Sequence, residues 1–185
     1  MMTDQSFENF DTSLYPENSR KMMKFILSQT KKYAEDFGKE DCGKNIMFYG
    51  GTGLGKTHLS TAIAGKIIER GFDVCYDTAT NVFGAFESER FGKQISKFAT
   101  PTERYFECDL LIIDDLGTEP ITQYKISFLY NLINTRSMNA RPVLLNTNLS
   151  LADMQKKYGD RIASRLFGES VILKFTGKDI RLQKI

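Results

Sequence analysis

A glycine-rich segment ending in lysine and threonine constrains the fold of this chain more than any other feature. Residues 50–57 read Gly-Gly-Thr-Gly-Leu-Gly-Lys-Thr and match G-x-x-x-x-G-K-[ST] at each fixed position. The apolar residues 46–49 lead directly into this segment. The pattern needs a strand before the loop and a helix after it, because loop amides and the helix N-terminus together surround a phosphate. It therefore predicts an α/β fold that binds a nucleoside triphosphate, rather than a chance glycine-rich turn.

Each residue type in this loop has a physical role. The glycines let successive N–H groups turn toward one point, Lys56 can neutralise the outer phosphates, and the Thr57 hydroxyl can ligate Mg²⁺. His58 is the only histidine, and a place in the first helical turn suits it better than a catalytic role. The predicted nucleotide-binding residues of this segment are Gly50, Gly51, Thr52, Gly53, Leu54, Gly55, Lys56, Thr57 and His58.

Two carboxylates follow a second apolar run. Residues 110–113 are continuously apolar, as expected for a strand buried on both faces of a parallel sheet, and Asp114 and Asp115 come directly after them. Parallel α/β sheets place ligands at the carboxyl ends of their strands, so we expect both carboxylates near the phosphate loop. Asp114 then holds Mg²⁺ opposite Thr57, and Asp115 orients or deprotonates the attacking water. An acidic helix cap or a solvated loop pair is the alternative.

Alternating strands and helices predict a three-layer α/β architecture. Strands are expected near 44–49, 72–77, 110–113, 141–146 and 170–175. Helices are expected near 18–37, from the loop to Gly71, and near 79–91, 101–107, 122–139, 150–157 and 160–167. This alternation favours a mainly parallel, five-stranded sheet with helices on both faces. On the first helix, the residues predicted to face the core are Met22, Ile26, Tyr33 and Phe37.

Composition limits the class of protein. The 185 residues fit one domain, expected at 18–185, with an N-terminal arm at 1–17. The net charge of +2 is too small to imply nucleic-acid binding by itself. No apolar stretch is long enough to span a bilayer and no signal pattern is present, so a cytoplasmic protein without a membrane partner is expected. The odd cysteine count without C-x-x-C spacing favours reduced thiols at Cys42, Cys75 and Cys108.

Further polar residues stand at the later strands and helices. Asn148 follows the strand at 141–146 and can bond the attacking water or the terminal phosphate, although asparagine also favours turns. Arg161 and Arg165 share one helical face, where a guanidinium can pair with a phosphate across a subunit boundary. The alternative for them is a solvated basic face with Asp160 as its partner. Arg181 is a further candidate near the C-terminus.

Taken in order, these segments resemble a known family. Residues 7–11, 50–59, 109–117, 147–149, 161–166 and Arg181 are similar to the AAA+ ATPase domain of bacterial replicative-helicase loaders of the DnaC/DnaI type, which are relatives of the initiator DnaA. The resemblance implies a P-loop NTPase fold of the AAA+/ASCE type that binds and hydrolyses ATP with Mg²⁺. It also implies Asn148 as first sensor, Arg165 as arginine finger with Arg161 nearby, and Arg181 as second sensor.

The same resemblance implies a role in DNA replication. It predicts a replicative DNA helicase as partner, binding of single-stranded DNA, and ATP-dependent self-association. The segment between the second and third strands carries basic and aromatic residues of the kind used for such binding: Phe83, Phe86, Arg90, Lys93, Lys97 and Arg104. The alternative assigns the two phenylalanines to the core.

Two departures from the family pattern leave other functions open. Such loaders carry an N-terminal domain that grips the helicase, and residues 1–17 are too few for it, so we expect an excised ATPase domain or a short, phage-encoded relative. Asp115 stands where most AAA+ proteins have glutamate, so slow hydrolysis is expected. The alternatives are a transposition helper ATPase acting on duplex DNA, and a weakly hydrolysing, nucleotide-gated protein-binding module. A small-molecule kinase is disfavoured, because no lid or acceptor pocket is recognisable.

Overall fold

A five-stranded parallel sheet forms the centre of the computed structural model, which describes residues 5–39, 44–92 and 101–183. The strands lie in the order β2-β3-β4-β1-β5, and every neighbouring pair is parallel. The predicted mainly parallel sheet of five strands is therefore confirmed. The strands are β1 (Asn45–Tyr49), β2 (Val74–Thr78), β3 (Leu110–Leu116), β4 (Val143–Thr147) and β5 (Ser170–Lys174).

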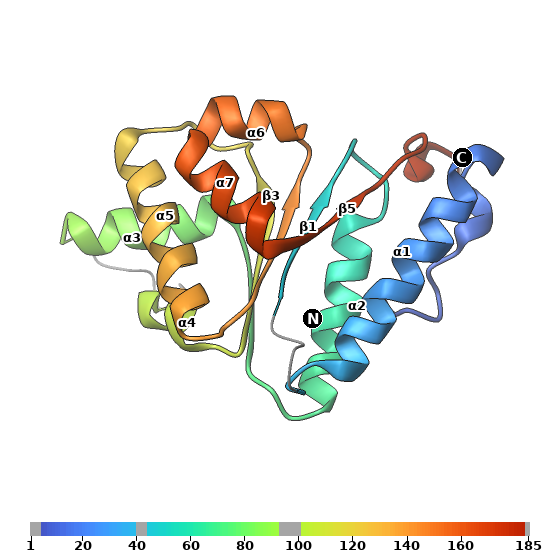
Figure 1. The fold of residues 1–185 in the computed structure, drawn as a ribbon, viewed down its shortest axis with the longest axis horizontal. Helices are drawn as coiled ribbons and strands as arrows, with labels where there is room; N and C mark the ends of the chain where they lie inside the picture. Colours follow the sequence, from blue (N-terminus) through green and yellow to red (C-terminus); the bar gives the residue numbers. More distant parts are fainter. Residues whose placement is uncertain (1–4, 40–43, 93–100, 184–185) are drawn as a thin grey trace.

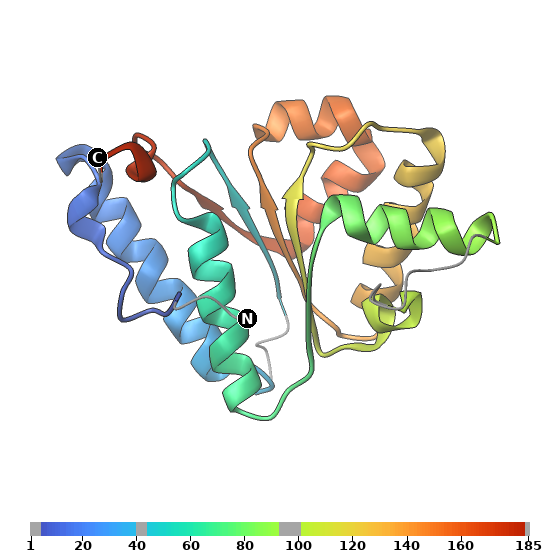
Figure 2. The same cartoon turned by 180° about the vertical axis from the view of Figure 1, so that it is seen from behind.

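Helices cover both faces of this sheet, as Figures 1 and 2 show. One face carries α1 (Glu17–Asp36) and α2 (Lys56–Glu69). The other face carries α3 (Ala79–Arg90), α4 (Thr102–Glu107), α5 (Gln123–Met138) and α7 (Asp160–Glu169). Helix α6 (Leu151–Tyr158) follows the carboxyl end of β4 and packs against α7. The predicted three layers are thus confirmed. Two 3₁₀ turns, η1 (Thr12–Leu14) and η2 (Ile180–Gln183), complete the described elements.

The two faces of the sheet contribute to two separate hydrophobic clusters. Along β3, Leu110 and Ile112 pack with α1 and α2, whereas Leu111 and Ile113 pack with the helices on the other face. Successive side chains of a strand point to opposite faces, so a strand covered on both sides needs an unbroken apolar run. The sequence of β3 has this run because the strand is covered on both sides.

The buried face of α1 differs in part from its predicted face. Met23, Ile26 and Ala34 are buried, and Phe37 just beyond the helix is buried as well. Met22 is 46% exposed, so its predicted place in the core was wrong. Each residue advances about 100° around a helix. The buried residues Ser19, Met23, Ile26, Thr30 and Ala34 therefore form one stripe along α1, and Met22 lies to one side of it.

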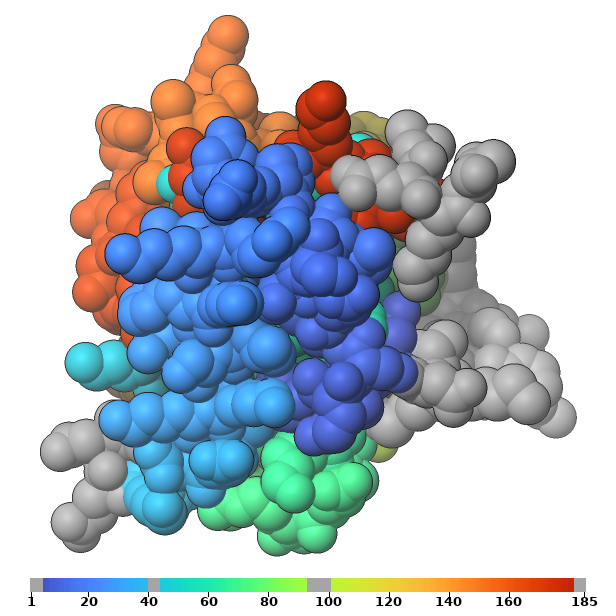
Figure 3. Space-filling view, turned by 90° about the vertical axis from the view of Figure 1, so that its right-hand side faces the viewer, coloured from blue at the N-terminus to red at the C-terminus, as the bar shows by residue number. Residues whose placement is uncertain are grey.

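The N-terminal segment runs along the α1 and α2 side of the molecule. Phe7, Phe10 and Tyr15 are buried in the cluster that α1 and α2 form with the sheet. Figure 3 shows this segment and α1, both in blue, covering this side of the molecule. Among the helices of the described ranges, none combines the length and apolar character needed to cross a bilayer.

Candidate functional site

Residues 50–57 form the turn from β1 into α2, in the strand–loop–helix setting that the motif requires. Helix α2 begins at Lys56, and Gly55 before it supplies no side-chain cap. The first amides of a helix have no partner within the helix and point beyond its start. Together with the helix dipole they favour an anion at this position.

Two glycines of the loop are required by close neighbours as well as by backbone conformation. Gly50 has φ 142°, and a Cβ there would stand 2.2 Å from the carbonyl oxygen of Phe175. Gly55 has φ 84°, and a Cβ there would stand 2.7 Å from the ring of Phe10 and 2.8 Å from the Tyr15 hydroxyl. Any larger residue would push the loop away from β5 or from the N-terminal segment.

Lys56 is the first residue of α2, its amine points back to the loop, and it is only 6% exposed. Its Nζ donates hydrogen bonds to the carbonyl oxygens of Gly50 at 2.7 Å and Gly51 at 2.6 Å, and to Oδ1 of Asn148 at 2.6 Å. Burial lowers the pKa of Lys56, while the nearby carboxylates of Asp115 and Asp114 act in the opposite direction. The fold thus brings Asn148 to the loop lysine from 92 residues away, the neighbourhood expected for a residue that reports on a terminal phosphate.

Asp114 is held in one orientation by three donors. The Tyr76 hydroxyl donates to its Oδ2 at 2.7 Å, and Nδ2 of Asn146 and the N–H of Asp115 each donate to its Oδ1 at 2.9 Å. Burial, followed by the charge of Asp114, raises the pKa of Tyr76, so its hydroxyl keeps the proton that it donates. Ser60 on α2 bonds Asn146 in turn.

Tyr76, Asn146 and Ser60 were not predicted from the sequence. Asn146 interrupts the apolar run of β4 and is completely buried there. A polar residue in a doubly covered strand needs a partner, and this interruption is the signal that could have identified it.

Asp115 points away from Asp114 because β3 has an irregularity at this position. The strand extends through Leu116, beyond the predicted end at Ile113, and its pairing with β4 shifts register between Ile113 and Leu116. Asp115 takes a left-handed conformation with φ 55° and is exposed. Desolvation and the charge of Asp114 raise its pKa, against the opposing effect of Lys56. A raised pKa makes a carboxylate a better proton acceptor, as a general base requires.

A pocket of about 580 Å³ joins these residues. This volume suits a small-molecule ligand. The pocket collects side chains from the N-terminal segment, the loop, the ends of β3 and β4, and the C-terminal segment. Its lining residues are Gln5, Thr52, Gly53, Leu54, Gly55, Lys56, Thr57, His58, Asp115, Thr118, Asn148, Ile180 and Arg181.

Both ends of the described chain hold this loop. The Tyr15 hydroxyl donates to the carbonyl of Leu54 at 2.7 Å, and the N–H of Ile180 donates to the carbonyl of Gly53 at 3.0 Å. Figures 1 and 2 show the C-terminal segment beside the start of α1 and the β1–α2 turn.

His58 lies in the first turn of α2, where its Nε2–H donates to the Ser6 carbonyl at 2.8 Å. Arg181 lines the pocket, and its guanidinium pairs with Asp179 at 2.8 Å.

The oxygen donors around the loop fit Mg²⁺ bound together with a nucleotide. Thr57 stands at the start of α2, and Asp114 and Asp115 stand at the end of β3. Within the described ranges, no group of three or more His, Cys, Asp or Glu side chains could hold a metal ion. Mg²⁺ usually keeps several waters and binds through one or two carboxylates plus phosphate oxygens. Both oxygens of Asp114 already accept hydrogen bonds, which suits contact with the ion through water.

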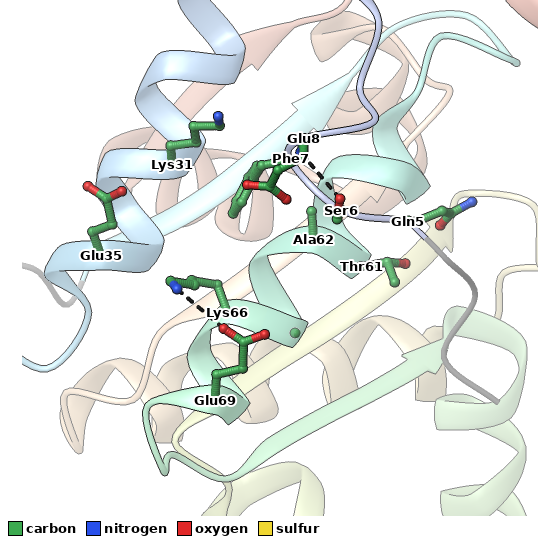
Figure 4. A pocket seen from close by; sticks show the side chains of 11 residues that line it. Gln5, Ser6, Phe7, Glu8, Lys31, Glu35, Thr61, Ala62, Lys66 and Glu69 are labelled. Carbon is green, nitrogen blue, oxygen red and sulfur yellow. Dashed lines mark hydrogen bonds and ion pairs between the residues drawn. The ribbon is translucent and has the colours of Figure 1, made fainter.

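A larger hollow of about 680 Å³ lies elsewhere, between the N-terminal segment, α1 and α2 (Figure 4). Its walls carry charges of both signs, among them Lys31, Glu35 and Glu69, and Lys66 already bonds Glu69 at 3.2 Å. Within the described part of the chain, its lining contains no glycine loop and no helix N-terminus. The smaller pocket therefore has the chemistry of a phosphate site.

Arg161 and Arg165 lie in a different depression, of about 600 Å³, formed by α5 and α7. Arg165 donates from Nη1 to Oδ1 of Asn134 at 2.6 Å and pairs with Glu169 at 3.5 Å. Of the described residues that line the loop pocket, none belongs to α7. The fold therefore does not bring these arginines to the phosphate loop of their own chain.

Among the described residues of the segment between β2 and β3, some are buried and others are exposed. Phe83 and Phe86 are buried and pack on Phe128, so the alternative that places them in the core is confirmed. Arg90 stacks on the ring of Tyr124 at 4.3 Å, and Arg104 pairs with Asp73 at 2.5 Å; Lys93 and Lys97 lie outside the described residues.

Comparisons of sequence relate the chain to known proteins. Residues 4–185 match the protein family described as "IstB-like ATP binding protein". The replicative helicase loader DnaC of Escherichia coli K12 is 27% identical over 177 residues, which cover 95% of this chain and 69% of that protein. The chromosomal replication initiator protein DnaA of Campylobacter jejuni strain 81116 is 33% identical over 165 residues, which cover 82% of this chain and 35% of that protein.

Solved structures share the fold. The DnaC helicase loader superposes with a TM-score of 0.77 at 22% identity, covering 95% of this chain and 98% of that chain. DnaI gives 0.73 at 19% identity, with coverage of 97% and 92%. AMPPCP-bound DnaA from Aquifex aeolicus gives 0.72 at 23% identity, with coverage of 100% and 54%. The predicted AAA+ P-loop NTPase fold and the resemblance to DnaC and DnaI are confirmed.

Proposed function

Because the chain belongs to the IstB-like ATP-binding protein family, we propose that it is an AAA+ ATPase that acts in DNA replication as a helicase loader. The main support for this proposal is the lining of the pocket at the glycine loop. Lys56, Asn148 and Asp115 all line this pocket, although they come from three separate segments. These are the groups needed to bind a terminal phosphate and to orient an attacking water.

ATP binding with Mg²⁺ is the first test. Lys56→Ala is expected to weaken ATP binding by about tenfold to a hundredfold, since a hydrogen bond to a charged group contributes about 1.5–3 kcal/mol. Equilibrium titration with a fluorescent ATP analogue measures the Kd. Lys66→Ala, an exposed lysine on the same helix, is the control and should leave the Kd unchanged. Equal affinity in Lys56→Ala and the wild-type protein would contradict the proposal.

The proposed client is a replicative helicase, and the proposed nucleic acid is single-stranded DNA. The E. coli relative named replicative helicase loader matches 95% of this chain. A replication initiator DnaA solved with AMPPCP and single-stranded DNA shares the fold with a TM-score of 0.75. Affinity capture from a bacterial lysate with ATP present should recover a replicative helicase; recovery of a transposase instead would refute this client.

A transposition helper ATPase is the second candidate. The name of the matching family, IstB-like ATP binding protein of IS21, favours it. The two candidates differ in their nucleic acid, because a helicase loader needs single strands and a transposition helper needs duplex. Fluorescence anisotropy with single-stranded and duplex oligonucleotides of one sequence, in ATP, distinguishes them. Tighter binding of the duplex would favour the second candidate.

A further inference from the structure

The loop that follows β3 is attached to α6 through a buried polar cluster. Glu119 is 3% exposed and Tyr158 is 1% exposed. The Tyr158 hydroxyl donates to Oε1 of Glu119, and the N–H of Gly117 donates to Oε2 at 2.9 Å. A carboxylate buried this deeply is stable only where its oxygens have donors, and here both have one. The cluster therefore joins the end of α6 to the loop.

Lys157 strengthens the same attachment. Its Nζ donates to the carbonyl of Gly117 and, at 2.9 Å, to the carbonyl of Glu119. Burial, followed by the interaction with Glu119, raises the pKa of Tyr158, so its hydroxyl remains a donor. Two consecutive residues at the end of α6 thus hold two residues of the loop, Gly117 and Glu119.

This loop determines the backbone at Asp115. The hydroxyl and the N–H of Thr118 both donate to the carbonyl of Asp115, at 3.0 and 3.4 Å. Asp115 has φ 55° and Gly117 has φ 109°. A Cβ at Gly117 would stand 2.6 Å from Leu149, so the turn has little room to shift. A left-handed non-glycine residue persists only where its surroundings determine it, and the α6 cluster supplies that constraint.

The cluster also connects Asp115 to the helix that carries the arginines. Tyr158 ends α6, Gly159 follows with φ 85°, and α7 begins at Asp160. Helices α6 and α7 pack against each other, as Figure 1 shows. A displacement of this helix pair would therefore act directly on Glu119 and Gly117.

We propose that Tyr158 and Lys157 are positioning residues, which act through Glu119 and the 117–119 backbone to orient Asp115 for ATP hydrolysis. A shift of the α6–α7 pair would thereby change the orientation of Asp115. This inference rests on the proposed ATPase function.

The first experiment separates turnover from binding. Tyr158→Phe removes one hydroxyl and keeps the buried ring; it should lower kcat for ATP by about tenfold to a hundredfold, the effect of a small misplacement of a catalytic group. The Kd for ATP should stay at the wild-type value, because Tyr158 lies outside the pocket lining. Equal losses in affinity and turnover would overturn the inference, since they would show a general role in the nucleotide pocket.

A double-mutant cycle tests the route through Asp115. In an Asp115→Asn background, Tyr158→Phe should cause no further loss of turnover, because groups that act as one unit are not additive. A purely structural role of Tyr158 predicts the same fold-loss in both backgrounds, and that result would overturn the inference.

Lys157→Met, at a half-buried residue, gives a second variant in case Tyr158→Phe fails to fold. Lys156→Met, an exposed neighbour on the same helix, is the matched control. Amide hydrogen exchange of residues 115–119 should be faster in Lys157→Met than in Lys156→Met and the wild-type protein, without nucleotide. Unchanged exchange together with normal wild-type turnover would overturn this inference alone. Absence of ATP turnover by the wild-type protein would overturn the proposed function.

Discussion

At the residue scale, two adjacent carboxylates have different environments. Asp114 is buried and accepts hydrogen bonds on both oxygens, whereas Asp115 is exposed, lines the pocket and has a raised pKa. The register shift in β3 causes this difference, because it turns the second carboxylate out of the sheet. One carboxylate is thus suited to a fixed charge near Mg²⁺ and the other to accepting a proton.

Asp115→Asn is expected to reduce ATP turnover by about a hundredfold or more, which is the typical contribution of a general base. The Kd for ATP should change little, because the amide keeps the size of the side chain. Phosphate release at saturating ATP and equilibrium titration measure the two quantities.

Asp153→Asn, an exposed change on α6, is the control for this substitution. If Asp115→Asn released phosphate at the wild-type rate, Asp115 would have no role in ATP hydrolysis. That result would favour the nucleotide-gated binding module instead.

At the scale of elements, a buried arginine joins the helices on one face to the sheet. Arg136 of α5 is completely buried and donates to the carbonyls of Tyr105 at 2.9 Å, Cys108 at 3.0 Å and Pro142 at 2.9 Å. Its Nη1 also lies 3.4 Å from Sγ of Cys108. A buried guanidinium needs such acceptors, so Arg136 ties together the turns that lead into β3 and β4.

The thiol beside Arg136 makes stability depend on pH. A hydrogen bond from Cys75 and then the charge of Arg136 lower the pKa of Cys108 from 9.0 to about 7. The folded state therefore loses the Cys108 proton at lower pH than the unfolded state does. This group adds stability that is complete above about pH 9 and is lost as the pH falls toward 7.

The free energy of unfolding of Cys108→Ser should lack this rise between pH 7 and 9. Urea denaturation across that range measures the difference from the wild-type protein. Parallel profiles for Cys108→Ser and the wild-type protein would contradict a folded-state thiolate at Cys108.

At the scale of the whole molecule, the nucleotide pocket and the arginine face are separate surfaces of one chain. The pocket lies where the N-terminal segment and the C-terminal segment meet the glycine loop, and the depression with Arg161 and Arg165 belongs to α5 and α7. A head-to-tail neighbour would join the two surfaces, because heterologous contacts pair different patches of identical molecules. ATP-dependent self-association is a proposal that follows from this separation.

Arg165→Ala should lower turnover at high protein concentration by about a thousandfold, the low end of the effect of an arginine finger. Mixing Arg165→Ala with Asp115→Asn should restore part of the activity, since one variant supplies the arginine and the other an intact pocket. Phosphate release at constant total protein measures this, with each variant alone as control. Wild-type turnover in Arg165→Ala, or no gain on mixing, would rule out the role in trans.

The local features of this fold could be predicted from sequence because neighbouring residues determine them. The glycine pattern at 50–57 specifies its own loop, and unbroken apolar runs identify strands that are covered on both faces. Of the three cysteines, Cys75 and Cys108 are free and buried, and Cys42 lies outside the described residues. The exposure of Met22 and the irregularity in β3 depend on packing partners, so residue periodicity missed both.

The sequence by itself determined that this chain has a phosphate loop in an α/β sheet. Both features depend on short stretches of neighbouring residues: the glycine motif at 50–57 and the apolar runs of the strands. Only the tertiary structure decided which distant side chains meet: Asn148 with Lys56, Tyr76 with Asp114, and Tyr158 with Glu119. Those meetings follow from the strand order β2-β3-β4-β1-β5 and from the placement of α6 beyond β4. Local residue patterns do not encode that order, because it results from how all the elements bury their apolar faces together.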